Sequence, residues 1–306
     1  MANFSETGSV RVAYLIMAHK LPAQLRRLIE RLSGPEARFL ISVDAQSDLS
    51  VFEQELRGLP VEIVQPRFVT SWGRYNLLRA KLAGMRQLIA SREAFDNLFI
   101  LSGQDYPLVS RAALLDYVVR HRGHSFVHHV PVTRTDTHLL SRLEKYHLFI
   151  PFNRAIIYPY DSANWVKRGI NQLLRLSGQF PLPRRLPLNY TLHFGSNWLQ
   201  LSARATQFIL AQMQANPAIE QYFQYTILPE EHMFQTMLLN ATEAQRGLIQ
   251  NLNYTFSHWH RPPELYAQPL SLTDLDAMLS SGCLMARKFD VTYDSSVLTW
   301  LDANAS

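Results

Sequence analysis

Apolar runs that end in polar turns alternate with segments of helical periodicity through the first hundred residues of the chain. Short apolar runs predict buried strands over residues 12–18, 39–43, 61–64 and 97–101. Between them, apolar side chains spaced three and four apart predict helices over 22–32 and 74–92. Strands that alternate with helices in this way favour a parallel sheet with helices on its faces. The expected fold class is therefore α/β, with a mostly parallel sheet flanked by helices.

The pattern is less regular beyond residue 125. A strand is predicted over 125–132, after which residues 133–190 are rich in Arg, Tyr, Pro and Asn and show no clean period. A regular pattern appears again in a strand-like stretch at 190–202. Helices are then predicted over 203–215, 229–239 and 273–279. There is no repeat and no Gly/Ser linker, so we expect a single domain over 10–302 in which 133–190 is a substrate-shaping insertion.

Composition and charge limit the classes of partner. The 306 residues are 47% hydrophobic, which is enough for a large core, and the net charge is +5. This charge favours anionic partners such as a nucleotide diphosphate, nucleic acid or an acidic membrane surface. Lys and Arg are scattered without a run of five or more. That scatter does not favour nucleic acid, whose binding footprint concentrates basic residues on one stripe.

The compartment expected from the sequence is the cytoplasm. The single cysteine, Cys283, excludes an intramolecular disulfide and suits a reducing compartment. The first nine residues lack the basic-then-apolar pattern of a signal peptide. No apolar stretch approaches the ~20 residues needed to span a bilayer. We therefore expect no transmembrane segment, and peripheral association with the inner membrane stays open.

Polar residues follow three of the predicted strands. His19 follows the first strand, Asp44 the second, and the turn 101–108, which contains Asp105, closes the fourth. In open α/β sheets, ligands bind outside the carboxyl ends of the strands, so we expect this turn to present an acid at a ligand site. The tetrapeptide 71–74 (Ser-Trp-Gly-Arg) precedes the long helix. The alternative interpretation for each of these groups is purely structural: the residues only close a turn or cap a helix or strand.

Pro229-Glu230-Glu231 is predicted to begin a helix. Proline suits the first helical position, and carboxylates in the first turn are favoured by the helix dipole. That structural explanation is sufficient for Glu230. Glu231 is also suited to act as a general base if it can reach a hydroxyl group.

Cations and an aromatic residue near the carboxyl terminus are further candidates. Arg287 and Lys288 are either solvated surface charges or a clamp for a diphosphate, whose developing charge paired cations stabilise. Arg261 is a weaker candidate for the same role. Trp259 either packs in the core or stacks on a sugar ring.

Several common motifs are missing. His128-His129 would point to opposite faces of a strand, and no Cys or acidic ligand follows His258 and His260 at metal spacing. No Asp-x-Asp occurs near a strand end, and neither G-x-x-x-x-G-K-[ST] nor G-x-G-x-x-G is present. The segment 195–197 (Gly-Ser-Asn) lacks the flanking glycines of a serine nucleophile elbow, which disfavours hydrolase chemistry.

Taken in chain order, these segments resemble the core-2/I-branching β-1,6-N-acetylglucosaminyltransferases and the related peptide O-xylosyltransferases. The resemblance spans residues 12–294, is weakest over 133–190, and rests on seven groups in the same order: 13–16 with 19–20, 39–44, 71–74, 101–108, 195–196, 229–231 and 288–290. Each group alone is unspecific, whereas the shared order is fairly specific. The family implies a GT-A-like, Rossmann-type fold. It also implies an inverting transfer from a UDP-sugar without a divalent metal or other cofactor.

The resemblance also implies roles for single residues. Glu231 matches the general base and Lys288 a cation on the donor diphosphate, while the second cation is assigned to Arg261 with Arg287 in reserve. The other implied contacts are with the uridine end of the donor (His19, Asp44, Arg74), the donor sugar (Asp105) and the acceptor (Arg142, Trp259). Residues 10–132 would then form the nucleotide-sugar-binding half, and 133–302 the acceptor-binding and catalytic half.

Departures from the animal members of the family bear on the acceptor. Those members are anchored in Golgi membranes and have several cysteines, and this chain shows neither feature. The resemblance then implies a bacterial-type enzyme that moves N-acetylglucosamine or xylose to a hydroxyl of a glycan acceptor, in surface polysaccharide or lipopolysaccharide synthesis. The alternative from another class is a non-catalytic nucleotide-sugar- or glycan-binding protein on the same scaffold. The presence of both Glu231 and Lys288 favours the enzyme.

Overall fold

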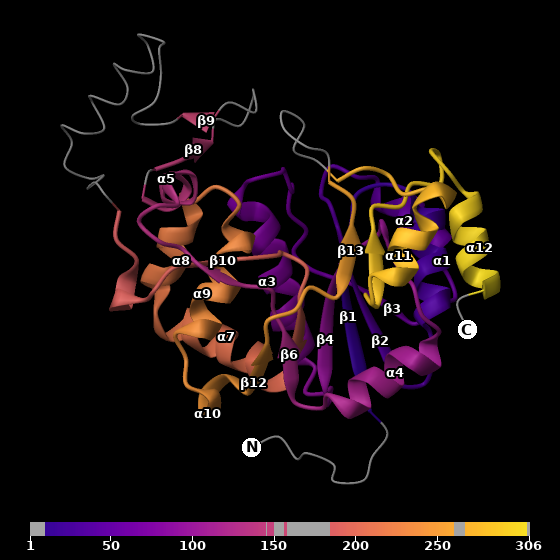
Figure 1. Cartoon of the computed structure of the whole chain (residues 1–306), viewed down its shortest axis with the longest axis horizontal. Helices are drawn as coiled ribbons and strands as arrows, with labels where there is room; N and C mark the ends of the chain where they lie inside the picture. Colours follow the sequence, from indigo (N-terminus) through magenta and orange to yellow (C-terminus); the bar gives the residue numbers. More distant parts are fainter. Residues whose placement is uncertain (1–9, 145, 150–155, 158–183, 260–266, 305–306) are drawn as a thin grey trace.

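The centre of the molecule is a seven-stranded sheet in the order β12-β6-β11-β4-β1-β2-β3. The computed structural model describes residues 10–144, 146–149, 156–157, 184–259 and 267–304 (Figure 1). The strands of this sheet are β1 (Val12–Ala18), β2 (Ala37–Val43), β3 (Val61–Ile63), β4 (Asn97–Ser102), β6 (His124–Phe126), β11 (Gln200–Ser202) and β12 (Leu248–Gln250). Within the sheet, β11 alone is antiparallel to its neighbours. The expected α/β class with a mostly parallel sheet is confirmed.

Side chains of the central strands alternate between two apolar cores. Along β1, Tyr14 and Ile16 belong to one core, whereas Ala13 and Leu15 belong to the other. This is the period of two that a strand covered on both faces requires.

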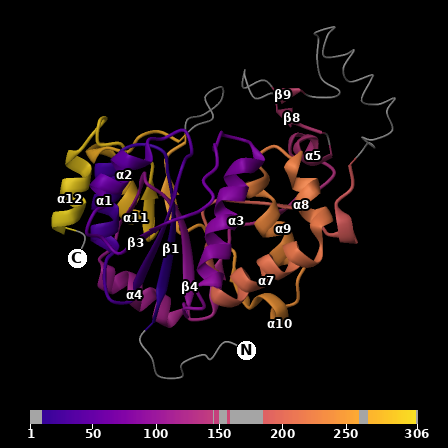
Figure 2. The same ribbon diagram turned by 180° about the vertical axis from the view of Figure 1, so that it is seen from behind.

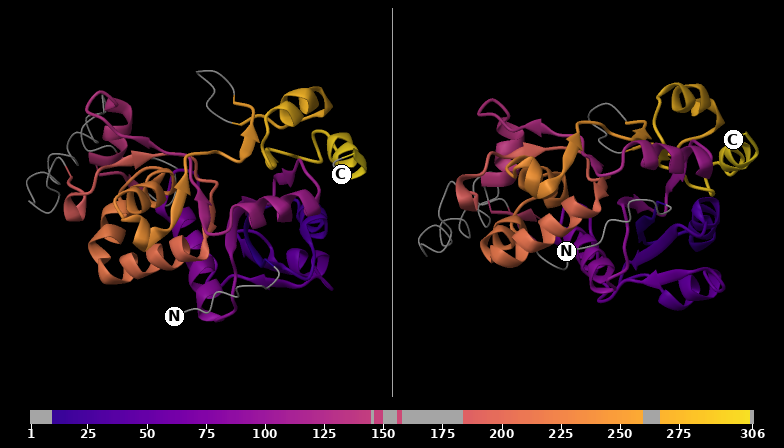
Figure 3. Two further views of the ribbon diagram at one scale, coloured as in Figure 1. Left: turned by 60° about the horizontal axis from the view of Figure 1, so that its bottom comes forward. Right: turned by 90° about the horizontal axis from the view of Figure 1, so that it is seen from below.

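Two groups of helices cover these two cores. The first core is covered by α1 (Pro22–Leu32), α2 (Leu49–Glu55), α4 (Arg111–Arg120), α11 (Leu275–Ser280) and α12 (Ser296–Asn304). The second core is covered by α3 (Tyr75–Ala90), α7 (Ala203–Ala215), α8 (Pro217–Gln224) and α9 (Met233–Leu239). Figures 1 and 2 show the two groups on either side of the central strands, and Figure 3 shows the same division from the lower end of the strands. Within the described residues, no helix has both the length and the apolar character needed to cross a membrane.

A small three-stranded sheet, β13-β14-β5, brings the carboxyl-terminal part of the chain to the end of β4. Its strands are β13 (Thr255–Ser257), β14 (Met285–Arg287) and β5 (Asp105–Pro107). Two residues separate the end of β4 from the start of β5, and β5 pairs antiparallel with β14, so that Arg287 lies opposite Asp105. The remaining elements are β7 (Val130–Pro131), α5 (Thr137–Glu144), β8 (Leu148–Phe149), β9 (Ile156–Ile157), η1 (Pro187–Asn189), β10 (His193–Phe194), η2 (Pro229–Glu231), α10 (Glu243–Arg246) and η3 (Leu272–Asp274).

The strand predicted over 125–132 is wrong as one element. The chain forms β6 up to Phe126 and then, from Val130, a separate short strand, β7. β6 pairs with β11 and β12 in the main sheet, whereas β7 pairs with β10 outside it. The two halves of the predicted strand therefore belong to different sheets. This choice depends on partners that come much later in the chain.

Candidate active site

The polar residues that follow β1, β2 and β4 lie at one edge of the sheet. Ala18 pairs with Val43 of β2, and Met17 pairs with Ser102 of β4. Because these three strands are parallel, their carboxyl ends lie at the same edge of the sheet, and His19, Asp44 and the turn at 103–105 follow directly from those ends. The expectation that these groups share an edge is confirmed.

Asp44 organises the loops at this edge. Its side chain is buried and accepts hydrogen bonds from the backbone amide of Gln46 at 2.7 Å, from that of Thr70 at 2.7 Å and from the Thr70 hydroxyl. The Arg67 guanidinium donates to the backbone oxygens of Asp44 and Ser47 at 2.7 and 2.6 Å. The loop after β2 and the loop before α3 are therefore tied into one rigid surface beside His19.

Several cations gather beyond β1. Lys20 forms a 2.6 Å ion pair with Asp290. Burial lowers the pKa of His19, and the nearby charges of Lys20 and Lys288 lower it further. Burial also lowers the pKa of Lys288, with additional contributions from Lys20 and Arg287. The positive charges thus lower one another's pKa, and such a group of charges suits a ligand with more than one negative charge.

Asp105 faces inward and holds Arg287. The carboxylate is fully buried and accepts from the backbone amide and the hydroxyl of Ser102 at 2.9 and 2.7 Å. It forms an ion pair with the Arg287 Nε at 3.2 Å, and the Arg287 guanidinium lies 4.0 Å from the ring centre of Trp198. The expectation that this turn presents an acid outward is therefore wrong, because the register of β5 against β14 directs the carboxylate to the arginine. Burial raises the pKa of Asp105, against the opposing effect of Arg287.

Asp105→Asn is expected to destabilise the protein by about 3 kcal/mol, because it leaves the Arg287 guanidinium buried without its counter-charge. Urea denaturation of the variant and the wild type measures the difference. Glu62→Gln is the matched control, since it breaks the more exposed Arg38–Glu62 pair and should cost under about 1 kcal/mol. Equal effects of the two substitutions would show that the buried pair has no special role.

Glu231 lies in η2 and pairs with α5. Its Oε2 accepts from the Arg142 Nη1 at 3.1 Å, and both side chains are about one fifth exposed, at 21% and 18%. Burial raises the pKa of Glu231, whereas Arg142 acts in the opposite direction. The neighbouring Glu230 is fully buried, and burial raises its pKa to about 7. Glu231 is thus the partly exposed carboxylate of the two, and a base for a bound hydroxyl has to be reachable in this way.

The helix predicted over 229–239 is interrupted. Residues 229–231 form the short helix η2, His232 has φ −127° and ψ −42°, and α9 begins at Met233. The backbone oxygen of Glu231 accepts from the Gly195 amide at 2.8 Å. A bond from outside the helix therefore fixes the backbone at Glu231 and explains the break.

Residues 195–198, here called the bridge segment, connect Glu231 with Arg287. At one end, a Cβ added to Gly195 would lie 1.9 Å from the His128 backbone oxygen, so only glycine fits there. In the middle, the Ser196 backbone oxygen accepts from the Gln235 side chain at 2.7 Å. At the other end, Trp198 lies beneath the Arg287 guanidinium.

Lys81 is the residue of this cluster that the sequence analysis missed. It lies within the apolar face of α3, is fully buried, and its Nζ donates to the Asn197 backbone oxygen at 2.7 Å. The available signal was a lone lysine among Leu78, Leu82 and Met85 at helical spacing. A charge at a core position of an amphipathic helix is an informative exception.

The other predicted site residues are less closely connected with this cluster. Arg74 precedes α3, and its backbone amide donates to the Ser71 oxygen at 3.1 Å. Trp259 is 55% exposed, and its indole donates to the Ser257 hydroxyl at 2.8 Å. Arg261 lies outside the described residues. Among the described residues, no group of three or more His, Cys, Asp or Glu side chains could hold a metal ion.

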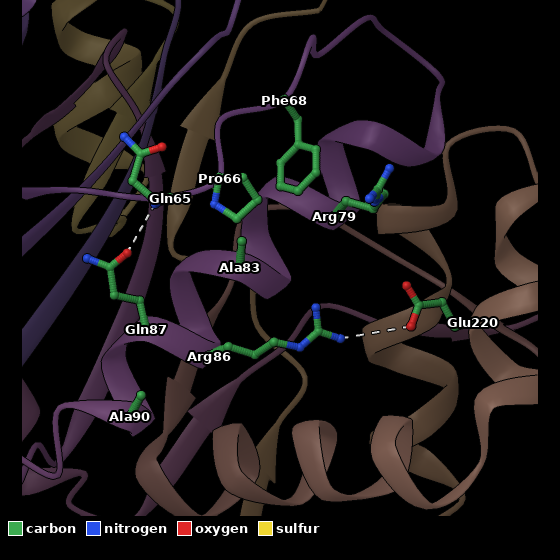
Figure 4. A pocket seen from close by; sticks show the side chains of 9 residues that line it. All are labelled: Gln65, Pro66, Phe68, Arg79, Ala83, Arg86, Gln87, Ala90 and Glu220. Atoms are coloured by element: carbon green, nitrogen blue, oxygen red, sulfur yellow. Dashed lines mark hydrogen bonds and ion pairs between the residues drawn. The ribbon is translucent and has the colours of Figure 1, made fainter.

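A separate pocket of about 560 Å³ lies along the outer side of α3 (Figure 4). None of the predicted site residues lines it, and its wall is formed by Gln65, Pro66, Phe68, Arg79, Ala83, Arg86, Gln87, Ala90 and Glu220. Arg79 stacks on Phe68 with 4.6 Å between the guanidinium carbon and the ring centre, and Arg86 lies 3.9 Å from Glu220. The cations of this pocket are thus separate from those at the sheet edge.

Comparison with known proteins gives one family and a set of distant relatives. The model of the Core-2/I-branching enzyme family matches residues 12–279. Xylosyltransferase 2 of Homo sapiens is 26% identical over 314 residues, which cover 96% of this chain and 33% of the human protein. Xylosyltransferase oxt of Drosophila melanogaster is 25% identical over 321 residues, covering 97% and 34%. The chain thus spans about one third of the length of these relatives.

Similarity to solved structures is weak. The 4-diphosphocytidyl-2C-methyl-D-erythritol synthase of Anaerococcus prevotii is 11% identical over 71% of this chain and 82% of its own, with a TM-score of 0.34. A cytidylyltransferase of Leptospira borgpetersenii covers 39% of this chain and 54% of its own at 17% identity, with a TM-score of 0.28.

Proposed function

This chain belongs to the Core-2/I-branching enzyme family, and on that premise we propose that it is an inverting glycosyltransferase that uses a UDP-sugar without a metal ion. The family and the xylosyltransferase relatives support sugar transfer in general. The observation that carries the finer proposal is the connection of Glu231 through the bridge segment to Arg287, which directly precedes Lys288 in the chain. This arrangement supports a site with Glu231 as the proposed base and with Arg287 and Lys288 as the cations proposed to neutralise a departing diphosphate.

The proposed reaction is a single displacement. Glu231 takes the proton of an acceptor hydroxyl, the hydroxyl oxygen bonds to the anomeric carbon, and the bond from that carbon to the UDP oxygen breaks. The leaving UDP keeps the electron pair of the broken bond. Lys288 and Arg287 neutralise the charge that develops on the diphosphate, which is the contribution that a divalent cation makes in other transferases. Because Arg287 is held in place by Asp105 and Trp198 and Lys288 is the next residue, we propose that these cations take the place of a bound ion.

The other parts of the edge are assigned to substrate binding. His19, Asp44 and Arg74 hold the uridine end of the donor, and Asp105 acts on the donor site through Arg287. Arg142 lies within the segment 133–190, where the acceptor is proposed to bind, and its guanidinium pairs with Glu231. The names of the relatives make xylose the first donor sugar to test and N-acetylglucosamine the second. The proposed acceptor is a hydroxyl of a bacterial surface glycan.

A panel of UDP-sugars tests the donor. A thermal-shift screen identifies binders, since a ligand at 100 times its dissociation constant stabilises a protein by ~2.7 kcal/mol. Release of UDP from each binder is then followed with and without EDTA. Slow release that EDTA does not change supports a metal-free transferase, whereas strict metal dependence contradicts that part of the proposal. Binding without turnover on any donor and acceptor would indicate a binding protein on the same scaffold.

The pH dependence of transfer tests Glu231 as the base. Burial raises the pKa of Glu231, and the base works only when ionised, so kcat should fall as the pH decreases through this raised pKa. Arg142→Met removes a cation that lowers the pKa of Glu231, and it should move the acid limb of the profile to higher pH. A pH–rate profile of both proteins measures the shift. An acid limb that stays in place, or moves to lower pH, would contradict the assignment.

A further inference from the structure

Lys81 is a charged side chain in the apolar core of the molecule. It lies in the middle of α3, is fully buried, and shares its face of the helix with Leu78, Leu82 and Met85. Removing an ammonium group from water costs free energy, and lysine is almost never fully buried unless it is paired. A leucine at this position would simply continue the apolar face. The lysine therefore needs a reason other than packing.

The ammonium group of Lys81 contacts the bridge segment. Its Nζ donates to the Asn197 backbone oxygen at 2.7 Å and lies 4.9 Å from the ring centre of Trp198. A cation over an indole ring is attracted to it, most strongly when both are shielded from water. Lys81 thus holds both the backbone and the side chain of the carboxyl-terminal half of the segment.

Each end of the bridge segment touches a residue of the proposed reaction. Gly195 donates to the Glu231 backbone oxygen at 2.8 Å, and Trp198 lies 4.0 Å from the Arg287 guanidinium carbon. Lys81 therefore anchors a segment that contacts both the proposed base and a proposed diphosphate cation. A shift of this segment would move the two groups relative to each other.

Charged residues on both sides of the bridge segment act on the pKa of Lys81. Burial and the charge of Arg287 lower the pKa of Lys81, whereas Glu230, Glu231 and Asp105 raise it, and the net result is a pKa of about 8. Both carboxylate oxygens of Glu230 are buried without a hydrogen-bond partner among the described residues. The ammonium group thus interacts electrostatically with acids on η2 and β5.

We propose that Lys81 is a positioning residue for the transfer reaction: its ammonium group fixes the bridge segment and thereby the placement of Glu231 relative to Arg287. The kinetic part of this inference rests on the proposed function, and the structural part rests on the contacts alone. A second consequence concerns charge. Arg142 on α5 and Lys81 on α3 both lower the pKa of Glu231, and Glu231 in turn raises the pKa of its neighbour Glu230 on η2. Loss of the Lys81 charge should therefore raise the pKa of Glu231.

Two substitutions separate the charge of Lys81 from its hydrogen bond. Lys81→Met keeps the length and removes both, whereas Lys81→Gln keeps a donor for the Asn197 oxygen and removes only the charge. The Met variant should lose about 10²-fold in kcat, as expected for a misplaced catalytic group, and its acid limb should move to higher pH. The Gln variant should recover part of kcat and keep the shifted limb. Arg86→Met, which removes a cation from the exposed side of the same helix, should change neither quantity.

Amide hydrogen exchange tests the structural part without turnover. In the Met variant, exchange within residues 195–198 should rise at least about tenfold, while α7 should exchange as in the wild type. A wild type that turns over no UDP-sugar would overturn the proposed function and leave this test in force. Unchanged exchange of the bridge segment, or an unchanged kcat with an unshifted acid limb, would overturn the inference. If Lys81→Met does not fold, Lys81→Gln still tests the charge through the shift of its acid limb, and Lys81→Leu, which also lacks the donor, takes the place of the Met variant in the exchange measurement.

Discussion

Replacing Glu231 with Gln is expected to reduce sugar transfer about 10³-fold, within the range of about 10²–10⁴ that a positioned general base contributes. The amide has nearly the same shape and still accepts the hydrogen bond from Arg142, but it cannot take the proton of the acceptor. UDP binding should be retained, because the cations at the sheet edge are unchanged. Initial rates with the best donor of the screen and a calorimetric Kd for UDP measure the two effects.

The matched control for this variant is Glu62→Gln, which removes a carboxylate from the Arg38 ion pair on β2 and β3, outside the cluster. It should keep both kcat and the Kd for UDP. Near-full turnover by Glu231→Gln would mean that another group deprotonates the acceptor. A simultaneous loss of UDP binding would show instead that Glu231 is needed to shape the donor site.

Elements whose side chains form a complete local pattern were predicted with their observed bounds. β1 is buried at all seven positions, and α1 begins at Pro22 and ends at Leu32 as its apolar spacing indicates. α7 begins directly after Ser202, whose hydroxyl accepts from the Ala205 amide. Propensity, periodicity and capping agree in these segments, and no distant partner has to be known.

Features that depend on distant partners could not be predicted. The inward direction of Asp105 follows from its pairing with Arg287, which is 182 positions later in the chain. The break at His232 follows from a hydrogen bond made by Gly195. The role of Lys81 becomes visible only when α3 is packed against the bridge segment. The sequence thus indicated which edge carries the site, while the pairing of its charges needed the fold.

The position of Arg287 in the structure changes the assignment of the second diphosphate cation. The resemblance put Arg261 first and Arg287 in reserve, but Arg261 lies outside the described residues. Arg287 is fixed between Asp105 and Trp198, directly before Lys288. A rigid guanidinium next to an ammonium matches the needs of a diphosphate better than two independent surface charges, because less ordering is required on binding. We therefore propose Arg287 as the second cation.

Replacing Lys288 with Met is expected to reduce kcat/KM for the UDP-sugar about 10²–10³-fold, the loss seen when one preorganised partner of a developing negative charge is removed. Lys288 has a pKa lowered by burial and by Lys20 and Arg287, so its ammonium is poorly solvated and gains most from a nearby anion. For the same reason the wild type should lose donor binding at a lower pH than an ordinary lysine would allow. Initial rates and the Kd for UDP across the alkaline range measure both effects.

Two controls decide how the loss in Lys288→Met is read. Lys288→Arg keeps a charge that does not titrate, so it should preserve much of the activity and abolish the alkaline loss of donor binding. Arg204→Met removes an exposed cation at the start of α7 and should leave donor binding intact. If Lys288→Met binds UDP as well as the wild type, or if added Mg²⁺ alone restores its activity, the diphosphate is neutralised by something other than this side chain. The metal-free mechanism would then be lost, while the α/β scaffold and the family assignment would stand.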